Sequence, residues 1–208
     1  MRFLIPISIL VLLSACGSAY KHLQKSNGSP DCIPSLVPEY NTTLYRAQID
    51  VTGHYLSGLL IIKQLPDSSV RLLFTNEAGF KFFDFGFPPT GNMIVHHITD
   101  KMNRKAVIKT LRKDFQLLLM NRLGNARYLS KTDGTYAYHI YKQGKDHYYY
   151  KTPAGCDSLL AMERGSKRKK VVDIQFTGMN KSLPDSVFIK HNNFAFNITL
   201  KQINNYAE

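Results

Sequence analysis

The sequence predicts a mainly β protein: an incomplete antiparallel β-barrel of about 11 strands with one covering α-helix. Three observations support this. From residue 44 onward, short runs of β-branched and aromatic residues alternate with turn sequences such as Asp133-Gly134. One segment, residues 100–120, has no proline or glycine and has helical spacing instead. Several strand segments are apolar on both faces, so the sheet needs cover on both faces or a partner.

The N-terminal residues 1–15 predict a secretory signal peptide. Arg2 gives a positive start, residues 3–13 are apolar, and Ser14 and Ala15 are small. The apolar stretch is shorter than the about 20 residues that a membrane-spanning helix needs. Residues 13–16 resemble the bacterial lipobox, so we expect Cys16 to be the lipidated first residue of the mature protein. An ordinary cleavable signal is the alternative.

Residues 16–43 are predicted to be a lipidated tether followed by a loosely ordered lead-in. Gly17, Gly28 and Pro30 favour a flexible chain, and Pro34 and Pro38 interrupt any helix. An extended chain spans about 3.3–3.6 Å per residue, so such a tether would hold the domain at residues 44–208 a few tens of ångströms from the membrane at most.

The three cysteines predict one disulfide. Lipidation uses Cys16, which leaves Cys32 and Cys156 as an even pair in an oxidising compartment. A bridge between them would close a loop that spans most of the chain, and the chain-entropy model gives roughly 4–5 kcal/mol for loops of about 100 residues. The alternative is two buried free thiols.

The first strands follow one another as hairpins. Thr52-Gly53, Pro66-Asp67-Ser68 and Ala78-Gly79 separate the earliest runs, as expected for consecutive antiparallel strands. The strands expected before the helix are residues 44–53, 55–65, 69–77, 80–87 and 92–98. Those expected after it are residues 126–131, 135–143, 146–152, 158–165, 169–178, 185–192 and 194–203.

The helix is predicted over residues 100–120, inserted after the fifth strand. Asp100 is a suitable N-cap. Lysines and arginines occupy its outer face, while apolar side chains recur at helical spacing on the other face: Met102, Ala106, Val107, Leu111, Phe115, Leu118 and Leu119.

The strand patterns indicate an apolar cavity. In residues 55–63 both alternating sets of side chains are apolar, and a single helix cannot fill a wide barrel of eleven or twelve strands. The remaining apolar wall would line a groove for acyl chains. Its expected lining is Leu60, Ile62, Leu72, Phe74, Phe80, Phe82, Leu111, Phe115, Phe176 and Phe196. A core filled by side chains is the alternative.

Three segments carry a family resemblance: residues 45–63, 71–85 and 110–119. With the order of five strands, a helix and further strands, they resemble the LolA/LolB-like lipoprotein-carrier fold, and in particular LolB-like lipoproteins of Bacteroidetes-type bacteria. The resemblance implies an incomplete barrel that accepts acyl chains of lipoproteins and helps to insert them into the outer membrane. LolB also carries a protruding apolar loop; the nearest candidates here are Leu65-Pro66 and Phe87-Pro88-Pro89.

No motif predicts catalysis. The sequence has no Gly-x-Ser-x-Gly, no phosphate-binding glycine loop and no zinc-ligand spacing. His96 and His97 are adjacent on a strand, so their side chains point to opposite faces and do not share a metal. Asp84 has no second acid or base near it in sequence. We therefore expect no enzyme activity, no cofactor and no metal.

The charge indicates acidic partners. The formal net charge is +12, and Lys167, Arg168, Lys169 and Lys170 form the one basic run, for which we expect contact with anionic lipid head groups. Export makes nucleic acid an unlikely partner. We expect an outer-membrane lipoprotein that faces the periplasm and binds acyl chains of lipid or lipoproteins. The alternative is a non-catalytic protein with a filled core that binds another envelope protein.

Overall fold

The computed structural model describes residues 18–90, 92–121, 123, 126–180 and 183–203. Cys16 and the expected signal peptide lie outside these residues. The described chain forms one antiparallel sheet of 13 strands and one α-helix. The strands are β1 (Gln24–Lys25), β2 (Thr42–Val51), β3 (His54–Gln64), β4 (Val70–Thr75), β5 (Lys81–Phe87), β6 (Ile94–Ile98), β7 (Arg127–Thr132), β8 (Tyr136–Gln143), β9 (Asp146–Pro153), β10 (Ala161–Gly165), β11 (Lys170–Asn180), β12 (Leu183–His191) and β13 (Phe196–Gln202).

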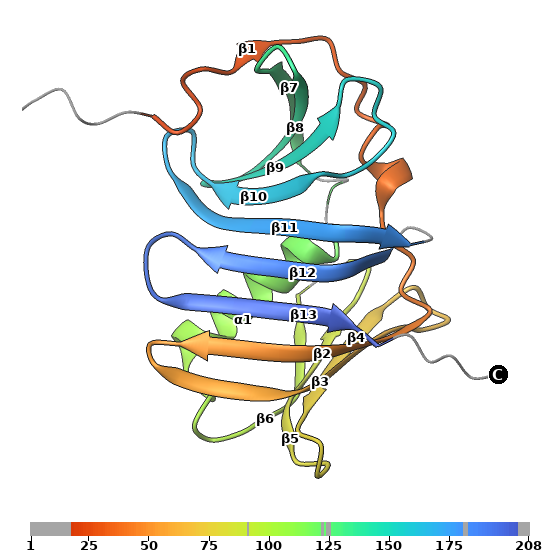
Figure 1. Cartoon of the computed structure of the whole chain (residues 1–208), viewed down its shortest axis with the longest axis vertical. Coiled ribbons are helices and arrows are strands. Elements are labelled where there is room, and N and C mark those ends of the chain that lie inside the picture. The colour runs from red at the N-terminus through yellow and green to blue at the C-terminus, as the bar shows by residue number, and fades with distance from the viewer. Residues whose placement is uncertain (1–17, 91, 122, 124–125, 181–182, 204–208) are drawn as a thin grey trace, which may run out of the picture.

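The strand order confirms an incomplete barrel. It runs β1-β7-β8-β9-β10-β11-β12-β13-β2-β3-β4-β5-β6, so β1 and β6 are two edges that do not pair with each other. Hairpins build each half, and β13 joins them by pairing antiparallel with β2. The sheet curls so that β7–β9 and β4–β6 turn away from the central strands (Figure 1). Each predicted strand segment corresponds to a strand, and β1 is additional.

The helix α1 (Lys105–Leu118) follows the fifth predicted strand, as expected, but it is shorter than predicted. Asp100 is not its N-cap, because residues 99–103 form a turn in which the N–H groups of Met102 and Asn103 donate to the carbonyl of Thr99. Arg104 is the N-cap. Among the described residues, no helix has the length and apolar character to cross a membrane.

The core lies between α1 and the concave face of the sheet. Leu111, Phe115 and Leu118 of α1 are buried against it. The Phe115 ring lies 5.8 Å from the ring of Phe83 and 6.5 Å from that of Phe87, measured between centroids. The helix therefore packs directly on the strands that the sequence predicted to be its wall.

The convex face is only half covered. In β3 the side chains of Leu60 and Ile62 are fully buried, whereas those of Leu59 and Ile61 are intermediate and Tyr55 is 61% exposed. Within the described chain, the outward apolar side chains of β3 are therefore only partly covered. Isolated apolar side chains on a solvated surface are common in antiparallel sheets.

Residues 18–43, expected to be a loose tether, pack on the end of the sheet. β1 pairs with β7, and a short 3-10 helix, η1 (Pro34–Leu36), follows. The side chains of Leu23, Ile33 and Tyr40 are buried. Scattered glycines and prolines suggested flexibility, but the apolar side chains between them pack on the sheet. Ile33 and Tyr40 join the main core cluster, and Leu23 joins a second cluster with Tyr138, Ile140 and Tyr149.

Candidate functional site

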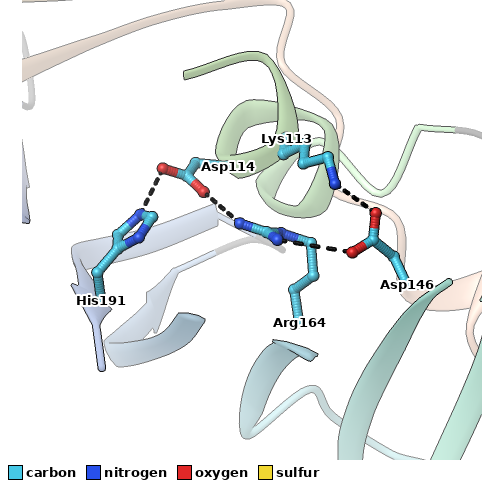
Figure 2. A network of polar contacts seen from close by, with 5 residues as sticks. All are labelled: Lys113, Asp114, Asp146, Arg164 and His191. Carbon is cyan, nitrogen blue, oxygen red and sulfur yellow. Dashed lines mark hydrogen bonds and ion pairs between the residues drawn. The ribbon is translucent and has the colours of Figure 1, made fainter. Parts of the chain in front are cut away.

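A buried network of charges joins α1 to the sheet (Figure 2). Asp114, on the inner side of α1, is fully buried. Its Oδ1 accepts a hydrogen bond from Nη2 of Arg164 in β10 at 3.3 Å, and its Oδ2 accepts one from Nε2 of His191 in β12 at 2.7 Å. Arg164 Nη1 also lies 3.8 Å from Asp146 Oδ1, and Lys113 Nζ pairs with the other oxygen of Asp146.

This network is incompletely satisfied. Nε of Arg164 and Nδ1 of His191 are buried and have no hydrogen-bond partner within the described residues. A buried ion pair contributes little net stability because desolvation offsets its attraction, and orphaned polar atoms weaken it further. The polar attachment of α1 is therefore specific in geometry but modest in strength.

Most of the predicted cavity lining comes together in one cluster. Phe82 and Phe176 pack against the cluster while partly buried. The fully clustered members are Leu60, Ile62, Leu72, Phe74, Leu111, Phe115 and Phe196. Two of them, Leu111 and Phe115, belong to α1 itself, so helix side chains occupy the space in which an acyl chain was expected.

Phe80 is the exception, because its side chain is 56% exposed. It belongs to the turn between β4 and β5, where its N–H donates to Oδ1 of Asn76 at 2.7 Å. The strand begins one residue later, and its inward positions go to Phe83, Phe85 and Phe87, which are all buried. The lining prediction was therefore wrong for Phe80, and it missed these three phenylalanines.

A small cleft opens beside the C-terminal end of α1. Its volume is about 220 Å³, including space open to solvent. The enclosed space within it is about 10 Å³, close to the room that one water molecule needs. Its lining combines tyrosines with polar amides: Asn121, Leu123, Ala126, Tyr141, Gln143, Tyr148 and Tyr150. An acyl chain of ordinary length does not fit this cleft.

A second polar cluster fixes residues 18–43. Cys32 and Cys156 form a disulfide with a Cα–Cα distance of 5.9 Å. The ring of His139, almost fully buried, lies against it, with Nε2 at 3.2 Å from Cys32 Sγ and Nδ1 at 2.9 Å from the Tyr128 hydroxyl. Burial lowers the pKa of His139. The sulfurs and His139 have the spacing of metal ligands, but the two sulfurs are bonded to each other and offer no thiolate.

The basic run separates into two kinds of cation. Lys167, Arg168 and Lys169 are exposed at the turn between β10 and β11. Lys170 is not free, because its Nζ pairs with Glu163 at 2.6 Å and with Asp173 at 3.7 Å. The expectation of head-group contact therefore does not fit Lys170, whose charge its own neighbours neutralise.

Asp84 forms an ion pair with Arg71. Nε and Nη2 of Arg71 donate to its two oxygens at 2.8 and 2.9 Å. The hydrogen bonds from Arg71 hold the pKa of Asp84 below its usual value. His96 and His97 are exposed on the edge strand β6, and the His97 ring contacts the Lys81 carbonyl. Within the described chain, these residues do not form an acid-base pair.

Comparison with solved structures gives likenesses in fold. No family model and no curated protein matches the chain. The structure is similar to the crystal structure of a DUF1329 family protein from Desulfovibrio piger, with a TM-score of 0.49 and 10% sequence identity, over 84% of this chain and 90% of that one. At this identity the likeness concerns the fold and assigns no role to any residue.

Proposed function

We propose that the protein is a lipid-anchored lipoprotein of the outer membrane that binds an acyl chain of lipid or lipoprotein on the concave face of its sheet. The chain would take the place of the apolar side of α1. The observation that carries this proposal is the cover itself: a single helix of 14 residues lies on a wall of buried phenylalanine, leucine and isoleucine side chains.

An alkyl chain can replace the contacts that the helix makes. Leu111, Phe115 and Leu118 supply apolar contacts to the wall. Each buried methylene contributes about 0.8 kcal/mol, so a chain of about 16 carbons contributes about 13 kcal/mol when fully buried. This is enough to offset the burial that α1 would lose by moving outward.

The polar network around Asp114 favours the replacement of α1 by a ligand with an anionic head group. If α1 moves away with Asp114, Arg164 and His191 stay on the sheet as donors at the edge of the apolar wall. Nε of Arg164 and Nδ1 of His191 already lack partners. These groups would then face the carboxylate or phosphate of the ligand. The proposed protein has no catalytic role and needs no cofactor.

Binding of a fluorescent fatty acid tests the proposal. The probe is added to the mature chain, residues 16–208, carrying Cys16→Ala so that it has no acyl group of its own. Asp114→Asn weakens the network, and Val107→Ala removes one contact of the half-buried Val107 in α1. Each 1.4 kcal/mol by which the closed position is weakened is expected to raise the apparent affinity about tenfold, up to its intrinsic value.

Tyr20→Phe is the matched control, because it removes a buried hydrogen bond from residues 18–43 instead of from α1. Its affinity is expected to stay unchanged. Equal gains in all three variants would mean that general loosening causes uptake. No saturable binding, together with no lipid bound to the exported protein in native mass spectrometry, would overturn the proposal.

The packed interior supports a second candidate. The apolar residues of α1 and of the sheet are buried against one another in this conformation. A protein with a permanently filled core would act as a non-catalytic lipoprotein that holds another envelope protein. Absence of acyl binding combined with a stable partner captured from the envelope would favour it.

A further inference from the structure

The described chain begins at the turn between β10 and β11. Ser18 Oγ donates to the carbonyl of Lys167 at 3.2 Å, and the N–H of Ala19 donates to the carbonyl of Arg168 at 2.9 Å. Two residue steps separate Ser18 from Cys16. An extended chain spans at most about 3.6 Å per residue, so two residue steps reach at most about 7 Å. A lipid on Cys16 would therefore enter a bilayer next to this turn.

The turn carries three exposed cations, Lys167, Arg168 and Lys169. Within the described residues none of them forms an ion pair. Close packing of their charges at a tip, away from the core, leaves them available to an external partner.

A neighbouring turn adds to this charge. Lys142 and Lys145 are exposed at the tip between β8 and β9. This tip lies beside the first one, since His147 pairs with Lys142 across β8 and β9 and with Gly165 across β9 and β10. Burial lowers the pKa of His147, and the charges of Lys142 and Lys167 lower it further. Both cations thus lie near the same ring.

The nearest acids do not neutralise these cations. Glu163 is paired with Lys170 and accepts a hydrogen bond from Tyr20. Asp146 is paired with Lys113 and Arg164. The two tips, defined by Lys142, Lys145, Lys167, Arg168 and Lys169, are therefore a cationic edge. In Figure 1 the turn between β10 and β11 lies at the left, where the described chain starts.

We infer that this cationic edge rests on the head groups of an anionic lipid bilayer and sets the orientation of the protein at the membrane. The position of the chain start favours a bilayer over a soluble acidic partner, because an anchor at Cys16 would hold the edge within a few ångströms of the surface. Contact at such distances escapes most ionic screening. The inference depends on the proposed function in one respect, which is the lipid on Cys16.

Vesicle binding tests it with the mature chain carrying Cys16→Ala, so that all binding comes from the protein surface. Vesicles of phosphatidylcholine with about 30% phosphatidylglycerol are compared with pure phosphatidylcholine in a co-sedimentation assay. We expect the protein to bind the anionic vesicles. In the variant Lys167→Gln/Arg168→Gln/Lys169→Gln the affinity for these vesicles should fall on the order of 100-fold.

The control removes the same charge elsewhere. Arg46, Lys63 and Lys201 are exposed on the adjacent strands β2, β3 and β13, toward the far ends of those strands. The variant Arg46→Gln/Lys63→Gln/Lys201→Gln is expected to keep most of the binding. Equal losses in the two variants would reduce the effect to net charge and overturn the inference.

Two further outcomes would also contradict it. One is equal binding to neutral and anionic vesicles. The other is tight binding to soluble polyglutamate without binding to anionic vesicles, which would indicate an acidic protein partner. Fatty-acid uptake by the Lys167→Gln/Arg168→Gln/Lys169→Gln variant, measured without vesicles, should equal that of the unmodified chain. Failure of vesicle binding with uptake intact would therefore remove this inference and leave the proposed function standing.

Discussion

Two covers lie on one curved sheet, and they are attached in different ways. α1 covers the wall of β2–β5 through apolar side chains and the network around Asp114. Residues 18–43 cover the other end through a disulfide, and through hydroxyls of Tyr128 and Tyr141 that donate to the carbonyls of Ser29 and Pro30 at 2.9 and 3.0 Å. One cover is covalently fixed, whereas the other is held by non-covalent contacts within the described residues.

The side chains of the wall explain the difference. β5 presents phenylalanines, which offer area but no directional contact. β7 and β8 present Tyr128 and Tyr141, whose hydroxyls donate to backbone carbonyls of residues 18–43. Tyr20 adds a ring stacked on Tyr149 at 3.9 Å between centroids, and its hydroxyl donates to Glu163 at 2.8 Å. The tyrosine end is therefore held by directional hydrogen bonds, and the proposed function assigns any opening to the phenylalanine end.

Loss of the disulfide is expected to have the largest effect on stability. The bond joins residues 124 positions apart, and the chain-entropy model gives about 5 kcal/mol for a loop of this length. The double variant Cys32→Ser/Cys156→Ser should lower the free energy of unfolding by that order in denaturant titration. Hydrogen exchange should rise first in residues 18–43 and in β7. A uniform rise that includes α1 would contradict the view that α1 and residues 18–43 are attached to the sheet independently of each other.

Removal of Asp114 is expected to rank next. Asp114→Ala removes the nearer acidic partner of buried Arg164 and leaves only Asp146 at 3.8 Å, and breaking a buried ion pair typically costs about 3–5 kcal/mol. Hydrogen exchange should then be fastest in α1 while β8 and β9 keep their protection. Asp100→Ala, in the exposed turn before α1, is the control and should change stability little. A cost below about 1 kcal/mol for Asp114→Ala would mean that the network does not hold the helix.

Hairpin patterns made most of this fold predictable. Thr52-Gly53 and Gly79 take positive φ in tight turns, and the strands on either side of them appear at the predicted places. Cys32 and Cys156 could be paired from their number alone. β1 was missed because its two residues are defined by a partner, β7, that lies about a hundred positions away in sequence.

The site was harder to predict than the fold. Apolar alternation identified Leu60 and Phe74 as inward residues, but it could not say that α1 would fill the space between them. Asp114 lies within an apolar helix face, and its partners Arg164 and His191 come from distant strands. No local pattern connects the three. Their juxtaposition depends on the curl of the sheet, which the sequence does not state in any one segment.

Within the fixed cover, Tyr20→Phe is expected to have a smaller effect than either change above. It removes the hydroxyl that donates to the buried carboxylate of Glu163, while the stacking on Tyr149 remains. Hydrogen bonds to charged groups contribute about 1.5–3 kcal/mol, so the free energy of unfolding should fall by that order. Tyr136→Phe, at a half-buried ring, is a suitable control. Equal losses in both variants would indicate a general effect of removing a tyrosine hydroxyl, and not the hydrogen bond to Glu163.

The smallest expected effect is a pH dependence that belongs to the fixed cover. Burial lowers the pKa of His139 below its ordinary value of 6.5, so the folded protein keeps the ring neutral where the unfolded chain already binds a proton. Stability from this group is complete above pH 6.5 and is lost as the pH falls from there toward the folded pKa.

The free energy of unfolding should therefore be lower at pH 5.5 than at pH 7.5 by on the order of 1 kcal/mol. In the variant His139→Gln this difference between the two pH values should be smaller. Burial also lowers the pKa of His147, so His147 adds a pH dependence of the same sign to the unmodified chain and to the His139→Gln variant. Because His139 contacts the disulfide and not α1, hydrogen exchange at pH 5.5 should rise around β8 before it rises in the helix. The opposite order would make the helix network the acid-sensitive element and would reverse the assignment of the two covers.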